Sequence, residues 1–281
     1  LTVSADLKIK FKGIHTHIKS VLHSLDGILR HKACATSMCL NINIISMALF
    51  YTTDIDKSPL LPEEESQHAV KVLRLQAGEM VELVDGKGNF YKAEVSIPHH
   101  KRCEVRILEK ISDFKKRGIH LHIAIEQTKN IERLEWFAEK ATEIGIDEIT
   151  PIICRFSERK VVKHDRLEKI IISAMKQSLK AYLPKLNEQC SFAEFMKRND
   201  VGMKFIGHCY EGQKQNLSKM YKAGENVTIL IGPEGDFSQE EVENAIKCGF
   251  MPISLGESRL RTETAGVVAC HTVNVINAMT E

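Results

Sequence analysis

The second half of the chain alternates between short apolar runs and longer stretches in which apolar residues recur at helical spacing. Predicted strands occupy residues 119–125, 149–154, 203–208, 227–231 and 252–255, with helices between them. Asn130 is a predicted helix cap, and the pairs Asp165 with Glu168 and Ser238 with Glu241 are predicted capping boxes. This alternation predicts an α/β fold whose parallel sheet is covered on both faces.

Residues 47–115 follow another pattern, in which short strands are separated by turns. Strands are expected at 48–52, 80–84, 90–97 and 102–110, with a hairpin turn at 85–89 and a short helix within 62–73. The segment 47–115 is therefore a predicted small barrel or sheet domain. Residues 115–118 are the expected linker to a second domain, 118–281. Residues 1–46 are basic and show no sustained period, so we expect an extension outside the folded core.

Composition narrows the class of protein. The chain is 43% hydrophobic and 27% charged, as in soluble globular proteins. No apolar run reaches the roughly 18 residues that span a bilayer. None of the eight cysteines forms a C-x-x-C pair, and the histidines form no H-E-x-x-H motif. We therefore expect a cytoplasmic protein with reduced thiols, no membrane partner and no metal.

Positive charge is concentrated in one segment. Residues 155–185 contain nine Lys or Arg residues and three acidic residues, although the net charge of the chain is only +2. Such a cluster is typical of a polyanion-binding surface, and a solvated helix face is the alternative. If the surface binds nucleic acid, the candidate residues are Arg155, Arg159, Lys160 and Lys163, with Arg74 in the first domain.

Two glycine-bearing loops end the predicted strands 227–231 and 252–255. The first is Gly232-Pro233-Glu234-Gly235, and the second begins at Gly256. We expect these strand ends to be adjacent, and ligands of α/β sheets bind at such ends. Neither loop has the P-loop or G-x-G-x-x-G pattern, which disfavours phosphate cradling and dinucleotide binding. The loops alone leave two alternatives: a nucleoside-type cofactor held by backbone groups, or structural turns.

Several spaced motifs resemble one family. They are I-G-P-E-G-D-F-S at 231–238, L-G at 255–256, L-R-T-E-T-A at 260–265 and K-A-T-E-I-G-I-D-E-I-T-P at 140–151. Together they resemble the RsmE family of SPOUT-class methyltransferases, and the resemblance covers residues 47–278. Such enzymes methylate N3 of a uridine in small-subunit ribosomal RNA. One departure is Asp236, where the family often has glycine; Asp accepts left-handed turn conformations.

The resemblance implies a C-terminal SPOUT domain with a deep trefoil knot, preceded by a PUA-like RNA-binding β-barrel at 47–115. It implies S-adenosylmethionine as cofactor, a homodimer through the knotted domain, and 16S rRNA of the small ribosomal subunit as partner, with uracil 1498 as the target. By position, the implied cofactor-binding residues are Leu230, Gly232, Glu234, Gly235, Leu255, Gly256, Leu260, Arg261, Thr262 and Ala265.

Methylation at uracil N3 requires removal of its proton, which spreads charge over O2 and O4. Arg261 could orient or stabilise the uracil, and Glu263 could help to remove the proton. The alternative is that these two residues form a structural pair at the start of the last helix. Two other functions are considered: a SPOUT methyltransferase acting on another RNA, and a non-catalytic RNA-binding or ribosome-assembly protein.

Overall fold

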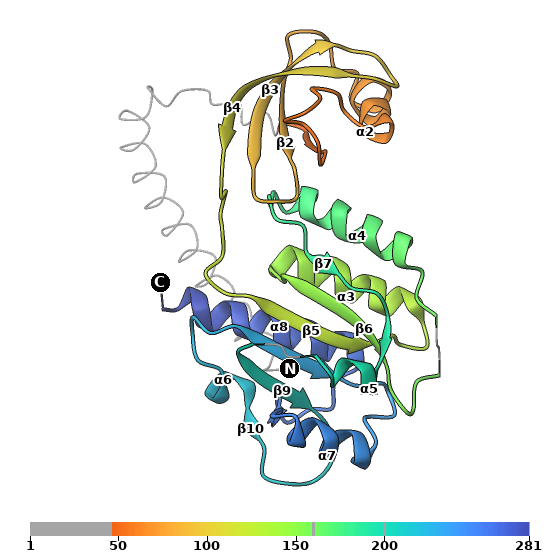
Figure 1. Cartoon of the computed structure of the whole chain (residues 1–281), viewed down its shortest axis with the longest axis vertical. Coiled ribbons are helices and arrows are strands. Elements are labelled where there is room, and N and C mark those ends of the chain that lie inside the picture. The colour runs from red at the N-terminus through yellow and green to blue at the C-terminus, as the bar shows by residue number, and fades with distance from the viewer. Residues whose placement is uncertain (1–46, 159–160, 199–200, 281) are drawn as a thin grey trace, which may run out of the picture. The chain divides into compact units, whose positions relative to one another are not determined.

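The computed structural model describes residues 47–158, 161–198 and 201–280. The expected extension, residues 1–46, lies outside the described residues. The described chain contains two sheets, one of four strands near its start and one of eight strands after it (Figure 1).

The first sheet consists of β1 (Leu49–Tyr51), β2 (Met80–Val84), β3 (Phe90–Ile97) and β4 (Glu104–Ile111). The strands follow the order β1-β2-β3-β4, with β1 parallel to β2 and the other pairs antiparallel. The positions of the strands were predicted correctly. The described strands form an open path with β1 and β4 at its two ends, which corresponds to the sheet alternative of the prediction and not to a closed barrel.

A small core stabilises this first sheet. The rings of Phe50 and Tyr91 are buried with Leu83 and Val95, among other apolar side chains. Beside the sheet lie helix α2 (Glu63–Gln67) and the π-helix η1 (His68–Val72). The hairpin between β2 and β3 is fixed by Asp85, whose Oδ1 accepts hydrogen bonds from the backbone N–H groups of Lys87 (2.8 Å) and Asn89 (3.0 Å).

The second sheet is parallel in all its described pairs. Its strand order is β10-β12-β9-β11-β5-β6-β7, and β8 also pairs with β6. The strands are β5 (Leu121–Glu126), β6 (Glu148–Ile153), β7 (Lys185–Leu186), β8 (Cys190–Ser191), β9 (Met203–Gly207), β10 (Gln215–Asn216), β11 (Val227–Ile231) and β12 (Met251–Ser254). The five long strands correspond to the predicted ones, whereas the three two-residue strands were not predicted.

Helices cover both faces of this sheet, as predicted (Figure 1). They are α3 (Ile131–Ile144), α4 (His164–Gln177), α5 (Phe192–Phe195), α6 (Leu217–Met220), α7 (Gln239–Lys247) and α8 (Thr262–Ala278). Because successive side chains of a strand point to opposite faces, Ile229 packs with the residues of α3 and α8, whereas Leu230 packs with those of α5 and α7. Each face therefore has its own apolar core.

The helix starts were predicted with mixed success. The Asn130 side chain caps α3, and Ser238 with Glu241 forms the capping box of α7. The predicted box of Asp165 with Glu168 was wrong. Helix α4 begins at His164, and its N-cap residue, Lys163, makes no side-chain cap. Asp165 lies instead in the first turn, where a carboxylate interacts favourably with the helix dipole.

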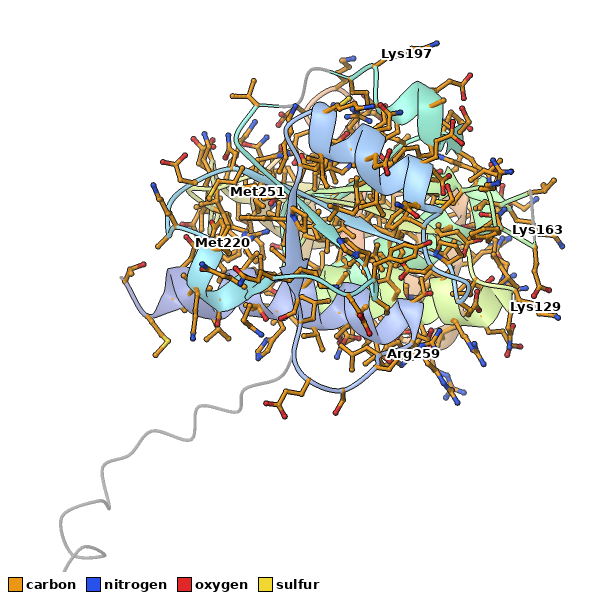
Figure 2. The ribbon with its side chains drawn as sticks, turned by 90° about the horizontal axis from the view of Figure 1, so that it is seen from below. Lys129, Lys163, Lys197, Met220, Met251 and Arg259 are labelled. Carbon is orange, nitrogen blue, oxygen red and sulfur yellow. The ribbon has the colours of Figure 1, made fainter. Side chains whose placement is uncertain are left out.

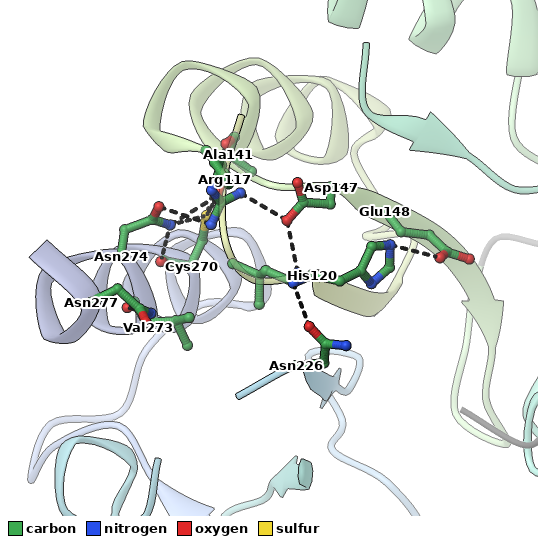
Figure 3. Close-up of polar contacts among 12 residues, drawn as sticks. Arg117, His120, Ala141, Asp147, Glu148, Asn226, Cys270, Val273, Asn274 and Asn277 are labelled. Carbon is green, nitrogen blue, oxygen red and sulfur yellow. Dashed lines mark hydrogen bonds and ion pairs between the residues drawn. The ribbon is translucent and has the colours of Figure 1, made fainter. Parts of the chain in front are cut away.

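The segment after β4 is anchored to the second sheet (Figure 3). Arg117 Nη1 donates to Asp147 Oδ2 at 2.8 Å, and its Nη2 donates to Asn274 Oδ1 at 3.1 Å. The same Asp147 oxygen accepts the Leu121 backbone N–H at 2.8 Å, where β5 begins. Residues 115–118 lie between β4 and β5, and Arg117 is held by α8 and by the loop before β6.

Helix α4 contacts the first sheet. Met175 of α4 and Ala181 share a buried cluster with Val84 and Phe90. Gly88 N–H also donates to the Ala181 carbonyl at 3.0 Å. None of the helices in the described ranges is both long and apolar enough to cross a membrane.

Candidate functional site

A cavity of about 780 Å³ lies at the carboxyl ends of β9, β11 and β12, beside the start of α8. Pockets that bind small molecules have similar volumes and combine an apolar lining with a few polar groups. Apolar side chains of Ile231, Ile253 and Leu255 line this cavity, together with charged side chains that include Glu234 and Arg261. It is thus suited to a ligand that has both an apolar and a charged part.

The first wall is the turn after β11. A Cβ atom on Gly232 would come 2.9 Å from the Phe237 ring, so this ring occupies the space that a side chain at position 232 would need. Asp236 has φ = +67°, the left-handed conformation that Asp tolerates better than most residues. The expectation that Asp236 accepts a left-handed turn conformation, in place of the glycine of the family pattern, is therefore confirmed.

The second wall is the loop between β12 and α8. Gly256 has φ = +138°, which favours glycine, and Arg261 occupies the N-cap position of α8. The hydroxyl of Thr262, the first residue of α8, donates to the carbonyl of Gly232 at 2.9 Å. This hydrogen bond joins the two glycine loops.

A third wall separates the other two. The sequence suggested that the two glycine loops end adjacent strands, but this is wrong, because β9 lies between β11 and β12. The segment after β9 contributes Gly207, His208, Cys209 and Lys214 to the lining. Strand β9 itself was predicted, so the rule that ligands bind at strand ends could have identified this segment. The sequence did not show the order of the strands, and therefore did not place β9 between β11 and β12.

Eight of the ten predicted cofactor residues line the cavity: Gly232, Glu234, Leu255, Gly256, Leu260, Arg261, Thr262 and Ala265. The other two, Leu230 and Gly235, are not among the lining residues. Leu230 is 0% exposed and points into the core beneath α7. Gly235 faces Phe156, whose Cβ would lie 3.3 Å from a Cβ added to the glycine.

The two predicted catalytic residues differ in solvent exposure. Arg261 lines the cavity and is exposed. Glu263 is only 7% exposed and is absent from the lining. Its Oε1 lies 3.8 Å from Nε of Arg133 in α3, and Arg133 Nη1 lies 3.4 Å from Glu234 Oε1 in the first wall. Arg133, which sequence reasoning missed, therefore lies between the first wall and the start of α8.

A buried carboxyl group lies beside the first wall. Glu126 follows Ile125, which is in register with Ile231, and is 1% exposed. Burial raises its pKa to about 8, and the carboxylates of Glu234 and Glu158 add to the rise, whereas a hydrogen bond from Ser157 lowers it. Glu126 is thus mainly protonated at neutral pH.

Residues 115–274 match the RNA methyltransferase domain family, and residues 61–108 match the RNA methyltransferase PUA domain. The chain belongs to this RNA methyltransferase family. Its curated relatives include ribosomal RNA small subunit methyltransferase E of Buchnera aphidicola, which is 29% identical over 225 residues, 77% of this chain and 87% of that protein.

Two solved structures are similar to the methyltransferase. One is a probable rRNA-methyltransferase from Porphyromonas gingivalis, 43% identical, with a TM-score of 0.79 over 84% of this chain and 100% of that one. The other is ribosomal RNA small subunit methyltransferase E from Neisseria gonorrhoeae bound to S-adenosyl methionine, 26% identical, with a TM-score of 0.71 over 82% and 97%. These comparisons agree with the family resemblance of the motifs.

The predicted RNA-binding residues of the methyltransferase lie on its surface where they are described. Arg74 has φ = +58° and is exposed, as are Arg155 and Lys163 (Figure 2 labels Lys163). Arg159 and Lys160 lie outside the described residues. Several other cations of the segment 155–185 form ion pairs, including Arg166 with Glu135 (2.7 Å), Lys169 with Glu64 (3.5 Å) and Lys185 with Glu148 (3.5 Å). These pairs reduce the charge that this segment can offer to RNA.

No group of three His, Cys, Asp or Glu side chains in the described part of the methyltransferase is arranged to hold a metal ion. The titratable side chains that line the cavity are carboxyl, ammonium, guanidinium, thiol and imidazole groups.

Proposed function

We propose that this protein transfers a methyl group from S-adenosylmethionine to N3 of a uridine in 16S rRNA, with uracil 1498 as the target. The observation that carries the proposal is the cavity at three strand ends, whose glycine walls contain the family's motifs. The relative from Neisseria gonorrhoeae with bound S-adenosyl methionine supports the choice of cofactor.

The lining residues fit S-adenosylmethionine. The purine ring and the methylene groups of the cofactor suit Ile253, Leu255 and Ala265, while backbone groups exposed at Gly232 and Gly256 suit its polar edges. The sulfonium and amino groups are cationic, and Glu234 supplies a carboxylate at the first wall. Bound in this way, the cofactor would supply a methyl group already activated by its sulfonium.

Arg261 is the residue that we propose contacts the uracil. It is exposed on the cavity wall, and a guanidinium group can stabilise the charge that develops on O2 or O4 when N3 loses its proton. The burial of Glu263 favours a different role for that residue. We propose that Glu263 holds Arg133, and through it Glu234, in place, which is closer to the structural alternative than to a general base.

RNA binding is proposed for the first sheet and for exposed cations of the second part of the chain, of which Arg259 lines the cavity. In Figure 2 the side chains of Lys129, Lys163 and Arg259 extend outward from the ribbon. The N3 atom lies on the Watson–Crick edge, so the target nucleotide must be unpaired or extruded. Binding through phosphate contacts should weaken linearly with the logarithm of salt concentration, and salt-insensitive binding would contradict this assignment.

Two finer features follow from the proposed SPOUT class. We propose that the chain segment carrying β12 and α8 is part of a trefoil knot, and that the protein is a homodimer through this region. Support comes from the hydrogen bond between Thr262 and Gly232 and from the apolar composition of α8, on which Val275 is 38% exposed. Sedimentation would test the dimer directly.

Calorimetry with S-adenosylmethionine, followed by transfer of its tritiated methyl group, tests the function. The acceptors are small ribosomal subunits, naked 16S rRNA, 23S rRNA and bulk transfer RNA. Transfer to 16S rRNA alone, free or in subunits, supports the proposal. Transfer to another RNA would favour the alternative substrate, and binding of RNA without binding of cofactor would favour a non-catalytic RNA-binding protein.

A further inference from the structure

The third wall of the cavity contains the imidazole of His208, which lies outside the family motifs at 140–151, 231–238, 255–256 and 260–265. His208 follows β9, is partly buried, and lines the cavity between the two glycine loops. Its ring lies 5.7 Å from the ring of Tyr210, centroid to centroid. Because β9 is the strand between β11 and β12, His208 lies in the cavity lining between the two glycine loops.

The Lys214 ammonium group lies beside one ring nitrogen of His208. Its Nζ lies 3.5 Å from His208 Nδ1, and it also donates to the carbonyls of His208 (2.7 Å) and Tyr210 (2.5 Å). An ammonium group has three protons and no lone pair, so Nδ1 beside it must act as an acceptor. The neutral ring then has its proton on Nε2 and presents an N–H donor.

The surroundings of His208 favour the neutral form of its ring. Burial lowers the pKa of His208, the Lys214 ammonium lowers it further, and Asp236 opposes the shift. The Asp236 carboxylate is occupied elsewhere, because Oδ2 accepts the Cys209 N–H at 2.6 Å and Oδ1 accepts the Phe237 N–H at 2.8 Å. Asp236 therefore connects the first and third walls.

We propose that Nε2–H of His208 donates a hydrogen bond to O4 of the target uracil, with Lys214 as the positioning residue that fixes the tautomer. The inference rests on the proposed function and adds a basis for substrate choice. Loss of the N3 proton increases the negative charge on O4, so an N–H donor there is most effective as the reaction proceeds. Cytosine has an amino group at this position, and two donors would then face each other, so His208 selects uridine over cytidine.

Kinetics of His208→Ala and His208→Gln test the proposal, with cofactor affinity measured separately by calorimetry. The Ala variant should lose about 10²-fold in kcat, the size expected for removing one donor to a developing oxyanion. Its affinity for S-adenosylmethionine should stay within twofold of the wild-type value. The Gln variant can place an amide N–H near the position of Nε2 and should recover part of the loss.

His120→Ala is the matched control. His120 is an exposed histidine just before β5, at the opposite, amino end of the sheet, and its Nε2 lies 3.4 Å from Glu148. This variant should retain wild-type kcat. Equal kcat for the wild type and His208→Ala would overturn the proposal, as would a loss of cofactor affinity that accounts for the whole defect.

Nuclear magnetic resonance of ¹⁵N-histidine-labelled protein gives a readout that does not depend on activity. The wild type should show His208 as the Nε2–H tautomer, and Lys214→Met should raise its pKa and reduce its preference for that tautomer. A predominantly Nδ1–H ring in the wild type would contradict the inference. Absence of methyl transfer by the wild-type protein would instead refute the proposed function, so the two failures are distinguishable.

Discussion

The Thr262 hydroxyl donates a hydrogen bond of 2.9 Å to the carbonyl oxygen of Gly232, which lies thirty residues earlier in the chain. Both residues line the cavity, and Thr262 is buried. This contact joins the turn after β11 to the first residue of α8. It holds two walls of the cavity at a fixed separation before any ligand binds, and such preorganisation lowers the entropic cost of binding.

Thr262→Val should therefore weaken binding of S-adenosylmethionine about tenfold. Valine keeps the shape of the side chain but leaves the Gly232 carbonyl without this donor, a loss of roughly 1–2 kcal/mol. Thr262→Ser keeps the hydroxyl and is the control, with an expected affinity close to that of the wild type. Calorimetry measures both, and equal affinity of the Val and Ser variants would exclude a role for the hydrogen bond.

Gly232→Ala should abolish measurable cofactor binding. The added Cβ would lie 2.9 Å from the Phe237 ring, so the turn or the buried ring must move. Gly118→Ala is the control, because a Cβ at that exposed position meets nothing within 4 Å. Wild-type affinity in Gly232→Ala would show that the first wall does not hold the cofactor.

The local features of this fold were predictable, but the features that depend on strand order were not. Asn130 caps α3 and Ser238 caps α7 through neighbouring residues, so short sequence windows contain the information. The box at Asp165 failed because α4 already begins at His164, which places Asp165 inside the first turn instead of at the cap. The same holds for the site. The two glycine loops were predicted from the sequence, but the presence of His208 in the cavity follows from the position of β9 between β11 and β12, which was not predicted.

Arg133→Met should destabilise the protein by about 2 kcal/mol, because it leaves the buried carboxylate of Glu263 without its cationic partner. Oε2 of Glu263 already has no hydrogen-bond partner among the described residues. Adding Glu263→Gln removes the buried charge and should restore most of the loss. Denaturant unfolding of the two single variants and the double variant measures the coupling, and strictly additive effects would refute it.

Glu126 should make stability fall as pH rises. Its pKa is raised from 4.5 to about 8, so the folded state holds a proton that the unfolded chain releases near pH 4.5. The stabilising contribution is complete below pH 4.5 and is lost progressively up to about pH 8. Glu126→Gln should thus resemble the wild type at pH 4 but be about 3–5 kcal/mol more stable above pH 8. Thermal unfolding at several pH values measures this difference, which should not appear if Glu126 is ionised in the folded protein at neutral pH.

The central claim is methylation of N3 in a uridine of 16S rRNA. The most direct measurement incubates the purified protein with S-adenosylmethionine and small ribosomal subunits that lack the modification, then analyses fragments and nucleosides of the 16S rRNA by mass spectrometry. We predict one 3-methyluridine per 16S rRNA, at uracil 1498, and none with Gly232→Ala. A methyl group on another base or another atom, or no methyl group with the wild-type protein, would contradict the account.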